Sequence, residues 1–151
     1  MLTDWRAVAS GLGAALLYLA VLALFPGFEG VRFAGVPLVL GTGLVAGAAA
    51  GIAADEGPTT GAWHGLLSGS LGGAAFAVTL VYVFAANEPY GVFYGLNYVL
   101  ALSAGDISVI ATHGRTVVAG LAGTGWVLIT VLGIYAGYTA PQREGRTLIE
   151  E

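Results

Sequence analysis

Four long apolar stretches constrain what this chain can fold into, and they cover about residues 5–25, 36–54, 62–86 and 116–138. Each is followed by residues that end helices, among them Pro26, Pro58 and Pro141. At about 1.5 Å per residue, helices of these lengths extend roughly 28 to 37 Å, which matches a bilayer hydrocarbon core of about 30 Å. The sequence therefore predicts an all-α fold, a polytopic transmembrane helical bundle with four spans.

The composition supports a membrane environment and excludes several kinds of site. Only 9% of the residues are charged, whereas a soluble domain carries about 25%. The chain has no Cys, which excludes disulfides, thiolate zinc sites and cysteine nucleophiles. The basic residues are five Arg with no Lys, and nine acidic residues bring the net charge to -4. This balance argues against a nucleic-acid partner and against a polybasic lipid-binding tail, and it suits a high-salt cytoplasm.

The spans predict one membrane-embedded domain, residues 1–140, and a short polar tail, residues 141–151. We expect the first stretch to be a span and not a cleaved signal peptide, because Asp4 beside Arg6 makes a poor positive n-region. Four spans place both termini on one side of the membrane. Three arginines then share the side of the termini and two lie opposite: Arg6, Arg143 and Arg146 against Arg32 and Arg115. This difference favours a multi-pass protein of the cell membrane with cytoplasmic termini.

The segment of about residues 90–113, between the third and fourth spans, is apolar but interrupted. An aromatic cluster at its start is typical of a membrane interface. Ser103 and Asp106 have the spacing of a helix start, which would divide the segment in two. We expect a short interfacial or half-inserted element, with a re-entrant pair or a fifth span as the alternatives.

Glycine residues recur at helical spacing inside the apolar stretches. On the third span, four glycines (Gly61, Gly65, Gly69 and Gly72) and Phe76 fall within one narrow stripe, while Trp63 points to nearly the opposite side, where it would anchor the interface. Lipid does not compete for backbone hydrogen bonds, so glycine is tolerated there and lets neighbouring helices approach closely. The predicted packing residues are Gly43, Gly47 and Gly51 on the second span, Gly61, Gly65, Gly69 and Gly72 on the third, and Gly133 and Gly137 on the fourth.

Smaller ridges of the same kind occur elsewhere, with Ala7, Gly11 and Ala15 on the first span and Ala119 with Gly123 on the fourth. Such ridges serve packing within one chain and packing between copies equally well. The spacing therefore leaves open whether the chain is a homo-oligomer.

His64 and Ser68 lie near the edge of the glycine stripe, one turn inside the third span. An intramembrane histidine is a candidate proton carrier or cavity-lining group. Its shallow position favours a neutral interfacial histidine bonded to a nearby carbonyl or hydroxyl.

Asp106, His113 and Arg115 form a second candidate polar site, which could line an ion entrance with Asp106 and Arg115 paired. The favoured interpretation is that Asp106 caps a short helix while Arg115 reaches from the start of the fourth span toward the interface.

Nothing in the sequence indicates an enzyme, a cofactor or a metal. The two histidines are 49 residues apart, and no nucleophile is paired with a base. The central parts of the four spans contain no Asp, Glu or Arg, which disfavours a transporter that depends on buried carboxylates.

Two motifs carry a resemblance: the "WRAV" stretch at Trp5–Val8 and the run "GAWHGLLSGSLGG" that follows a glycine-rich span and an acidic loop. In these features the chain resembles small haloarchaeal four-span membrane proteins of unknown function, over about residues 4 to 80. The segment of residues 90–115 departs from the shorter, more glycine-rich connection typical of that group. The resemblance implies a membrane location and a halophilic archaeal source, and it provides no catalytic residue.

Taken together, these features predict an integral membrane protein without a catalytic site. We expect an accessory or structural subunit that packs through glycine-rich helix faces, in contact with membrane lipid and with its own copies or a membrane-protein partner. The alternative is a small homo-oligomeric channel or carrier for ions or protons.

Overall fold

The computed structural model describes residues 3–31, 33–86 and 89–140, without the side chains of residues 104–106, 109 and 111. These residues form only helices: α1 (Trp5–Leu24), the 3-10 turn η1 (Pro26–Phe28), α2 (Gly35–Ala54), α3 (Pro58–Ala86), α4 (Val92–Asp106), α5 (Ser108–Thr112) and α6 (Gly114–Thr139). Four of them, α1, α2, α3 and α6, are long and apolar enough to cross a membrane. The predicted all-α bundle with four spans is confirmed, while the predicted polar tail and the prediction for Arg143 and Arg146 lie outside the described residues.

The helix boundaries follow from a few capping and stopping residues. Asp4 caps α1, since its carboxylate accepts a hydrogen bond from the Arg6 N–H at 2.8 Å. Asp55 ends α2 in the left-handed conformation at φ 46°. Helix α3 begins at Pro58, four residues before the predicted Ala62, because proline is well suited to a first helical turn.

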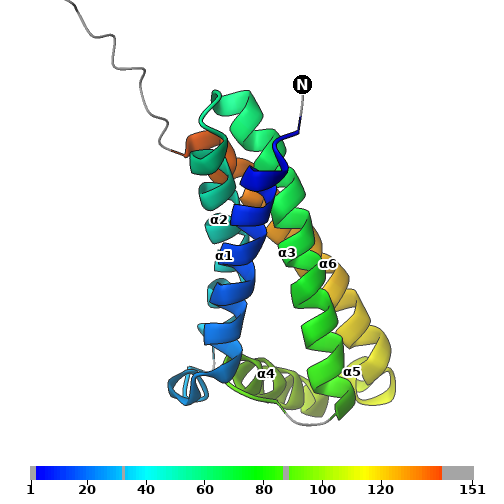
Figure 1. Cartoon of the computed structure of the whole chain (residues 1–151). Helices are drawn as coiled ribbons and strands as arrows, with labels where there is room; N and C mark the ends of the chain where they lie inside the picture. Colours follow the sequence, from blue (N-terminus) through cyan, green and yellow to red (C-terminus); the bar gives the residue numbers. More distant parts are fainter. Residues whose placement is uncertain (1–2, 32, 87–88, 141–151) are drawn as a thin grey trace, which may run out of the picture.

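The four long helices converge at one end of the molecule and spread apart at the other (Figure 1). Helix α6 packs against α3 and α2, and α1 packs against the same two helices from the other side. The start of α1 and the end of α6 lie together at the converging end (Figure 1).

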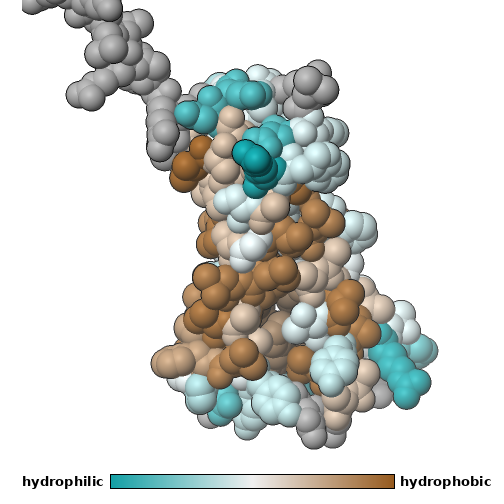
Figure 2. Space-filling view, in the orientation of Figure 1, coloured by the Kyte–Doolittle hydropathy of each residue, from teal (hydrophilic) through white to brown (hydrophobic). Residues whose placement is uncertain are grey.

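The outer surface suits a bilayer. On the face seen in Figure 2, hydrophobic residues cover the middle of the molecule, and more hydrophilic residues lie at both ends. Large apolar side chains point outward from the spans, for example Leu17, Val78 and Val127, which are 69%, 69% and 58% exposed. Apolar exposure of this extent is unusual on a soluble monomer and is typical of a lipid-facing surface. The chain is a multi-pass membrane protein.

Helices α4 and α5 form the element between the third and fourth spans. Helix α4 lies across the spread end of the bundle (Figure 1), and with 15 residues it is shorter than the four spans. The arrangement agrees with a short interfacial element and not with a fifth span.

The division of this segment differs from the expected one. Helix α4 continues through Asp106 and breaks at the extended residue Ile107, so the segment divides after Asp106 and not at Ser103. Ser103 does not cap a helix, because its hydroxyl donates to the Val99 carbonyl at 2.9 Å, one turn back in the same helix.

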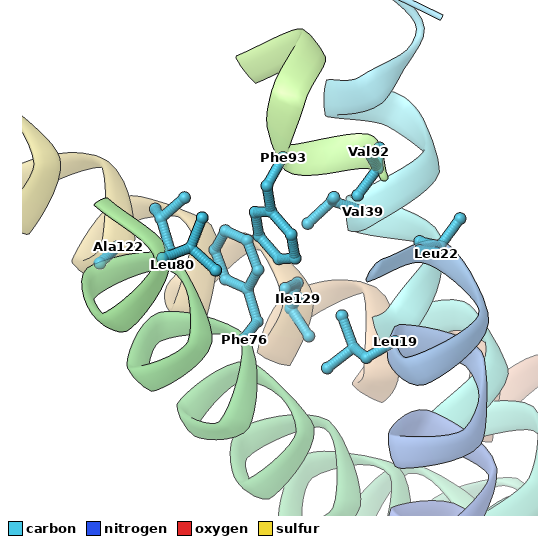
Figure 3. Packing of buried hydrophobic residues seen from close by; sticks show 10 residues of the cluster. Leu19, Leu22, Val39, Phe76, Leu80, Val92, Phe93, Ala122 and Ile129 are labelled. Carbon is cyan, nitrogen blue, oxygen red and sulfur yellow. The ribbon is translucent and has the colours of Figure 1, made fainter. Parts of the chain in front are cut away.

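A hydrophobic cluster fills the space where the spans diverge (Figure 3). At its centre the rings of Phe76 and Phe93 stack, with centroids 6.3 Å apart. Phe93 thereby anchors the start of α4 beneath the bundle. The turn before it requires Gly91, which has φ +50° and lies so close to the end of α1 that a Cβ atom would overlap the Leu22 carbonyl.

Candidate functional site

The most distinctive packing feature is a set of glycines that we call the glycine seam, formed by Gly43, Gly47 and Gly51 of α2, Gly61, Gly65 and Gly69 of α3, and Gly133 and Gly137 of α6. Helix α6 lies between the two other rows. A Cβ atom at either Gly47 or Gly65 would overlap the Gly133 carbonyl oxygen, so both rows are in backbone contact with α6.

The contacts between α3 and α6 are reciprocal. A Cβ atom on Gly133 would lie 2.6 Å from the Gly65 carbonyl oxygen, and one on Gly137 would overlap the Gly61 carbonyl oxygen. Each Cα therefore faces a carbonyl of the other helix, which is the geometry of Cα–H···O contacts between close membrane helices. In this structure the seam closes within one chain, which is the point that the spacing alone leaves open.

The predicted small residues outside the glycine seam differ in what they contact. Gly72 does not face α6, because a Cβ atom there would meet Ala15 of α1 at 3.0 Å. A Cβ atom on Gly11 would lie 2.5 Å from the Ala46 carbonyl oxygen, so α1 also packs closely. Gly123 is exposed, and a Cβ atom there would meet nothing within 4 Å. The predicted ridge of Ala119 and Gly123 therefore does not bring another helix of the described chain close to Gly123.

The sequence prediction lacks several close glycine contacts, and two of them join α3 and α6. A Cβ atom on Gly73 would lie 2.5 Å from the Trp126 ring, and Gly125 lies against the Phe76 ring. Both glycines face aromatic side chains, so a search for small residues paired with small residues cannot find them.

His64 lies in the second turn of α3 and is completely covered by protein, with 0% of its surface exposed. Its Nε2 accepts a hydrogen bond from the Asp4 N–H, and its Nδ1 donates to the Thr60 carbonyl, both at 2.8 Å. A backbone N–H can only donate and a carbonyl can only accept, so this pair of bonds requires the neutral Nδ1–H tautomer. The hydrogen bond to the Thr60 carbonyl agrees with the expected neutral histidine bonded to a nearby carbonyl, while the start of α1 also covers the ring, which the sequence does not predict.

The neighbouring Trp63 also ties the N-terminus to α3. Its indole is 40% exposed, and its Nε1 donates to the Thr3 hydroxyl at 3.1 Å. Residues 3 and 4 are thus held by two adjacent side chains of α3, one at the surface and one in the interior.

The interior polar residues form a row that ends inside the bundle. The Ser68 hydroxyl lies 2.8 Å from the His64 carbonyl oxygen and 3.2 Å from that of Ala46. Further along, the Thr42 hydroxyl is buried without a hydrogen-bond partner in the described chain. Its usual acceptor would be the Leu38 carbonyl one turn back, which instead accepts a hydrogen bond from the Tyr18 hydroxyl at 2.8 Å.

Beyond Thr42 lies the hydrophobic cluster of Figure 3, with Leu19, Val39 and Phe76 among its buried members. The polar row therefore does not continue to the other end of the bundle. Over the described residues, the interior offers no continuous polar path.

The second predicted polar site lies at the spread end of the bundle, away from His64. His113 is exposed, and its Nδ1 is 2.8 Å from the Thr112 hydroxyl. Arg115 is exposed in the first turn of α6 and lines a cleft of about 510 Å³. The side chain of Asp106 is outside the described part of the structure, so its pairing with Arg115 stays a prediction. Among the described residues, no three His, Cys, Asp or Glu side chains are grouped as metal ligands.

Comparisons with other proteins do not extend this description. No known protein-family model, curated protein or solved structure matches the chain, so the resemblance to haloarchaeal membrane proteins stays a prediction.

Proposed function

We propose that the protein is a non-catalytic structural or accessory subunit of a membrane assembly. The observation that carries this proposal is the glycine seam, in which two rows of glycines close on α6 within a single chain. Backbone contacts along three helices make a tightly packed converging end. Because the seam is used internally, a partner would bind the outer faces of the helices.

A small homo-oligomeric channel or carrier is the second candidate. The hydrophobic cluster closes the interior of one chain, so a pore would have to form between copies. The outer face of α6 favours such contact, since Gly120 and Gly123 have open space where a Cβ atom would lie. A neighbouring helix could approach closely there.

Three measurements separate these functions. Native mass spectrometry in detergent gives the number of copies, and reconstituted vesicles give the ion or proton flux. Co-purification from native membranes identifies a partner. A partner together with the absence of flux supports the accessory subunit. Flux from an oligomer that Gly123→Leu dissociates would replace this proposal with the channel.

We also propose that the termini are cytoplasmic, on the basis of the arginine distribution in the sequence. A Thr3→Cys variant tests the orientation, because the chain has no other Cys. In intact cells, an impermeant maleimide should leave this thiol unlabelled until the membrane is permeabilised. Labelling of intact cells would reverse the orientation.

A further inference from the structure

The cleft that contains Arg115 combines one charge with apolar walls. It lies between α3, α4, α5 and α6 at the spread end of the bundle and has a volume of about 510 Å³. Its side chains are apolar apart from Asn97, which is half-buried, and Arg115. The volume is in the range of about 300 to 1,000 Å³ that is typical of small-molecule sites.

A second cleft of about 220 Å³ extends this space toward the middle of the bundle, and Leu100 of α4 lines both. On α6, the lining residues Val118, Leu121 and Leu128 recur at helical spacing and so share one face. Arg115 and Leu128 are thirteen residues apart, which is about 20 Å along a helix. Along α6, the two clefts together therefore extend over about two thirds of the thickness of the hydrocarbon core, which is about 30 Å.

The charged end of this space lacks a counter-charge in the described chain. The Arg115 guanidinium makes no hydrogen bond or ion pair with any described residue, and the His113 side chain does not cap α6. Gly114, beside it, leaves open space where a side chain would stand. Arginine binds phosphate through two parallel hydrogen bonds, so this end is suited to a phosphate group.

We propose that the cleft binds one anionic phospholipid, with its phosphate at Arg115 and an acyl chain along the apolar wall toward Leu128. The charge selects an anionic headgroup. The apolar wall that extends from Arg115 toward Leu128 favours a lipid over a free anion, because a free anion would leave this wall without a ligand. Helix α4 would hold the chain against α3 and α6.

The test uses the full chain and an equimolar mixture of phosphatidylglycerol and phosphatidylcholine with identical acyl chains. After extraction from these vesicles into detergent, native mass spectrometry measures the ratio of the two lipids that remain bound. We expect wild type to retain phosphatidylglycerol about fivefold over phosphatidylcholine, the effect of one basic residue near the membrane surface. Arg115→Gln should reduce the ratio to about one, and Arg115→Lys should keep most of it. Arg6→Gln, which removes the same charge at the other end of the bundle, should leave the ratio unchanged.

A second pair of variants tests the apolar wall. Ala101 lines the larger cleft and is exposed, so Ala101→Phe should reduce the retention of both lipids. Ala9→Phe, at an exposed position of α1, is the matched control and should leave retention unchanged.

Three results would overturn the proposal. They are equal retention of both lipids by wild type, a loss in Arg115→Gln no larger than in Arg6→Gln, and the absence of any retained lipid. The ratio is measured within one spectrum, so it does not depend on how much of a variant folds.

Discussion

Replacing Gly47 by Ala perturbs the glycine seam with a single methyl group. The added Cβ atom would overlap the Gly133 carbonyl oxygen and lie 2.7 Å from the carbonyl carbon. Ordinary contact begins at 3.4 Å, so α2 and α6 must separate by at least 3.4 − 2.7 = 0.7 Å. Overpacking of this kind costs about 1 to 3 kcal/mol, and the better helix propensity of Ala offsets about 0.5 to 1 kcal/mol of it. We expect a net loss of up to about 2.5 kcal/mol in the free energy of unfolding.

Equilibrium unfolding in mixed detergent micelles, followed by circular dichroism, measures this loss. Gly123→Ala is the matched control, because a Cβ atom there meets nothing within 4 Å. The control should be neutral or stabilising by up to about 1 kcal/mol. If Gly47→Ala is as stable as Gly123→Ala, the two helix backbones are not in contact and the reasoning is wrong.

Three further substitutions test other parts of the interior by the same unfolding measurement. Thr42→Val should stabilise the protein by about 1 kcal/mol, because it removes a buried hydroxyl that has no partner in the described chain; a loss of stability would show that the hydroxyl is bonded. His64→Ala should cost about 2 to 3 kcal/mol through the loss of its two hydrogen bonds, whereas Trp63→Phe should cost less than about 1 kcal/mol; equal losses would contradict the buried position of His64. Trp126→Phe should lower the free energy of unfolding by about 0.6 kcal/mol, a typical value for an interhelical hydrogen bond in a membrane protein. The reason is that the Trp126 Nε1 donates to the Ser70 carbonyl at 2.8 Å, and an unchanged stability would argue against that bond.

The spans can be predicted from the sequence because the bilayer leaves a chain few options. A backbone inside the hydrocarbon core must satisfy its hydrogen bonds internally. The long apolar stretches that lie between Pro26 and Pro58 and before Pro141 therefore have to be helical. The ends of the spans follow from local residues, and they differ from the predicted ends by only a few residues. The start of α3 at Pro58 is the largest difference.

The neighbours of each small residue cannot be predicted in the same way. Gly69 and Gly72 are three residues apart on α3, yet the first faces α6 and the second faces α1. Which helix lies against which face depends on the arrangement of the whole bundle. The burial of His64 has the same origin, since the group that covers it is Asp4, 60 residues away in the chain.

The break before α5 shows a different limit. Ser103 and Asp106 carry the spacing of a helix start, but a serine hydroxyl can also bond to the carbonyl one turn back within a helix. Ser103 takes this second option, and the helix continues to Asp106. Local residue preferences do not distinguish the two outcomes.

A disulfide between α2 and α6 tests whether the glycine seam closes within one chain. A Cβ atom at Gly51 would lie 2.7 Å from the Ala140 Cβ, whereas disulfide-bonded Cβ atoms are about 3.5 to 4.5 Å apart, so a shift of about 1 Å at the end of α6 allows the bond. The natural chain has no Cys, so the two introduced thiols are the only ones. The control combines Leu44→Cys with Ala140→Cys, and its first thiol lies about 10 Å from position 51 along α2.

Oxidation of Gly51→Cys/Ala140→Cys in membranes, followed by mass spectrometry of the denatured chain, gives the result. If the seam closes within one chain, the product is a monomer that has lost two hydrogens and contains an internal disulfide, and the control gives no such product. A disulfide-linked dimer, or no more cross-linking than in the control, would contradict closure within one chain.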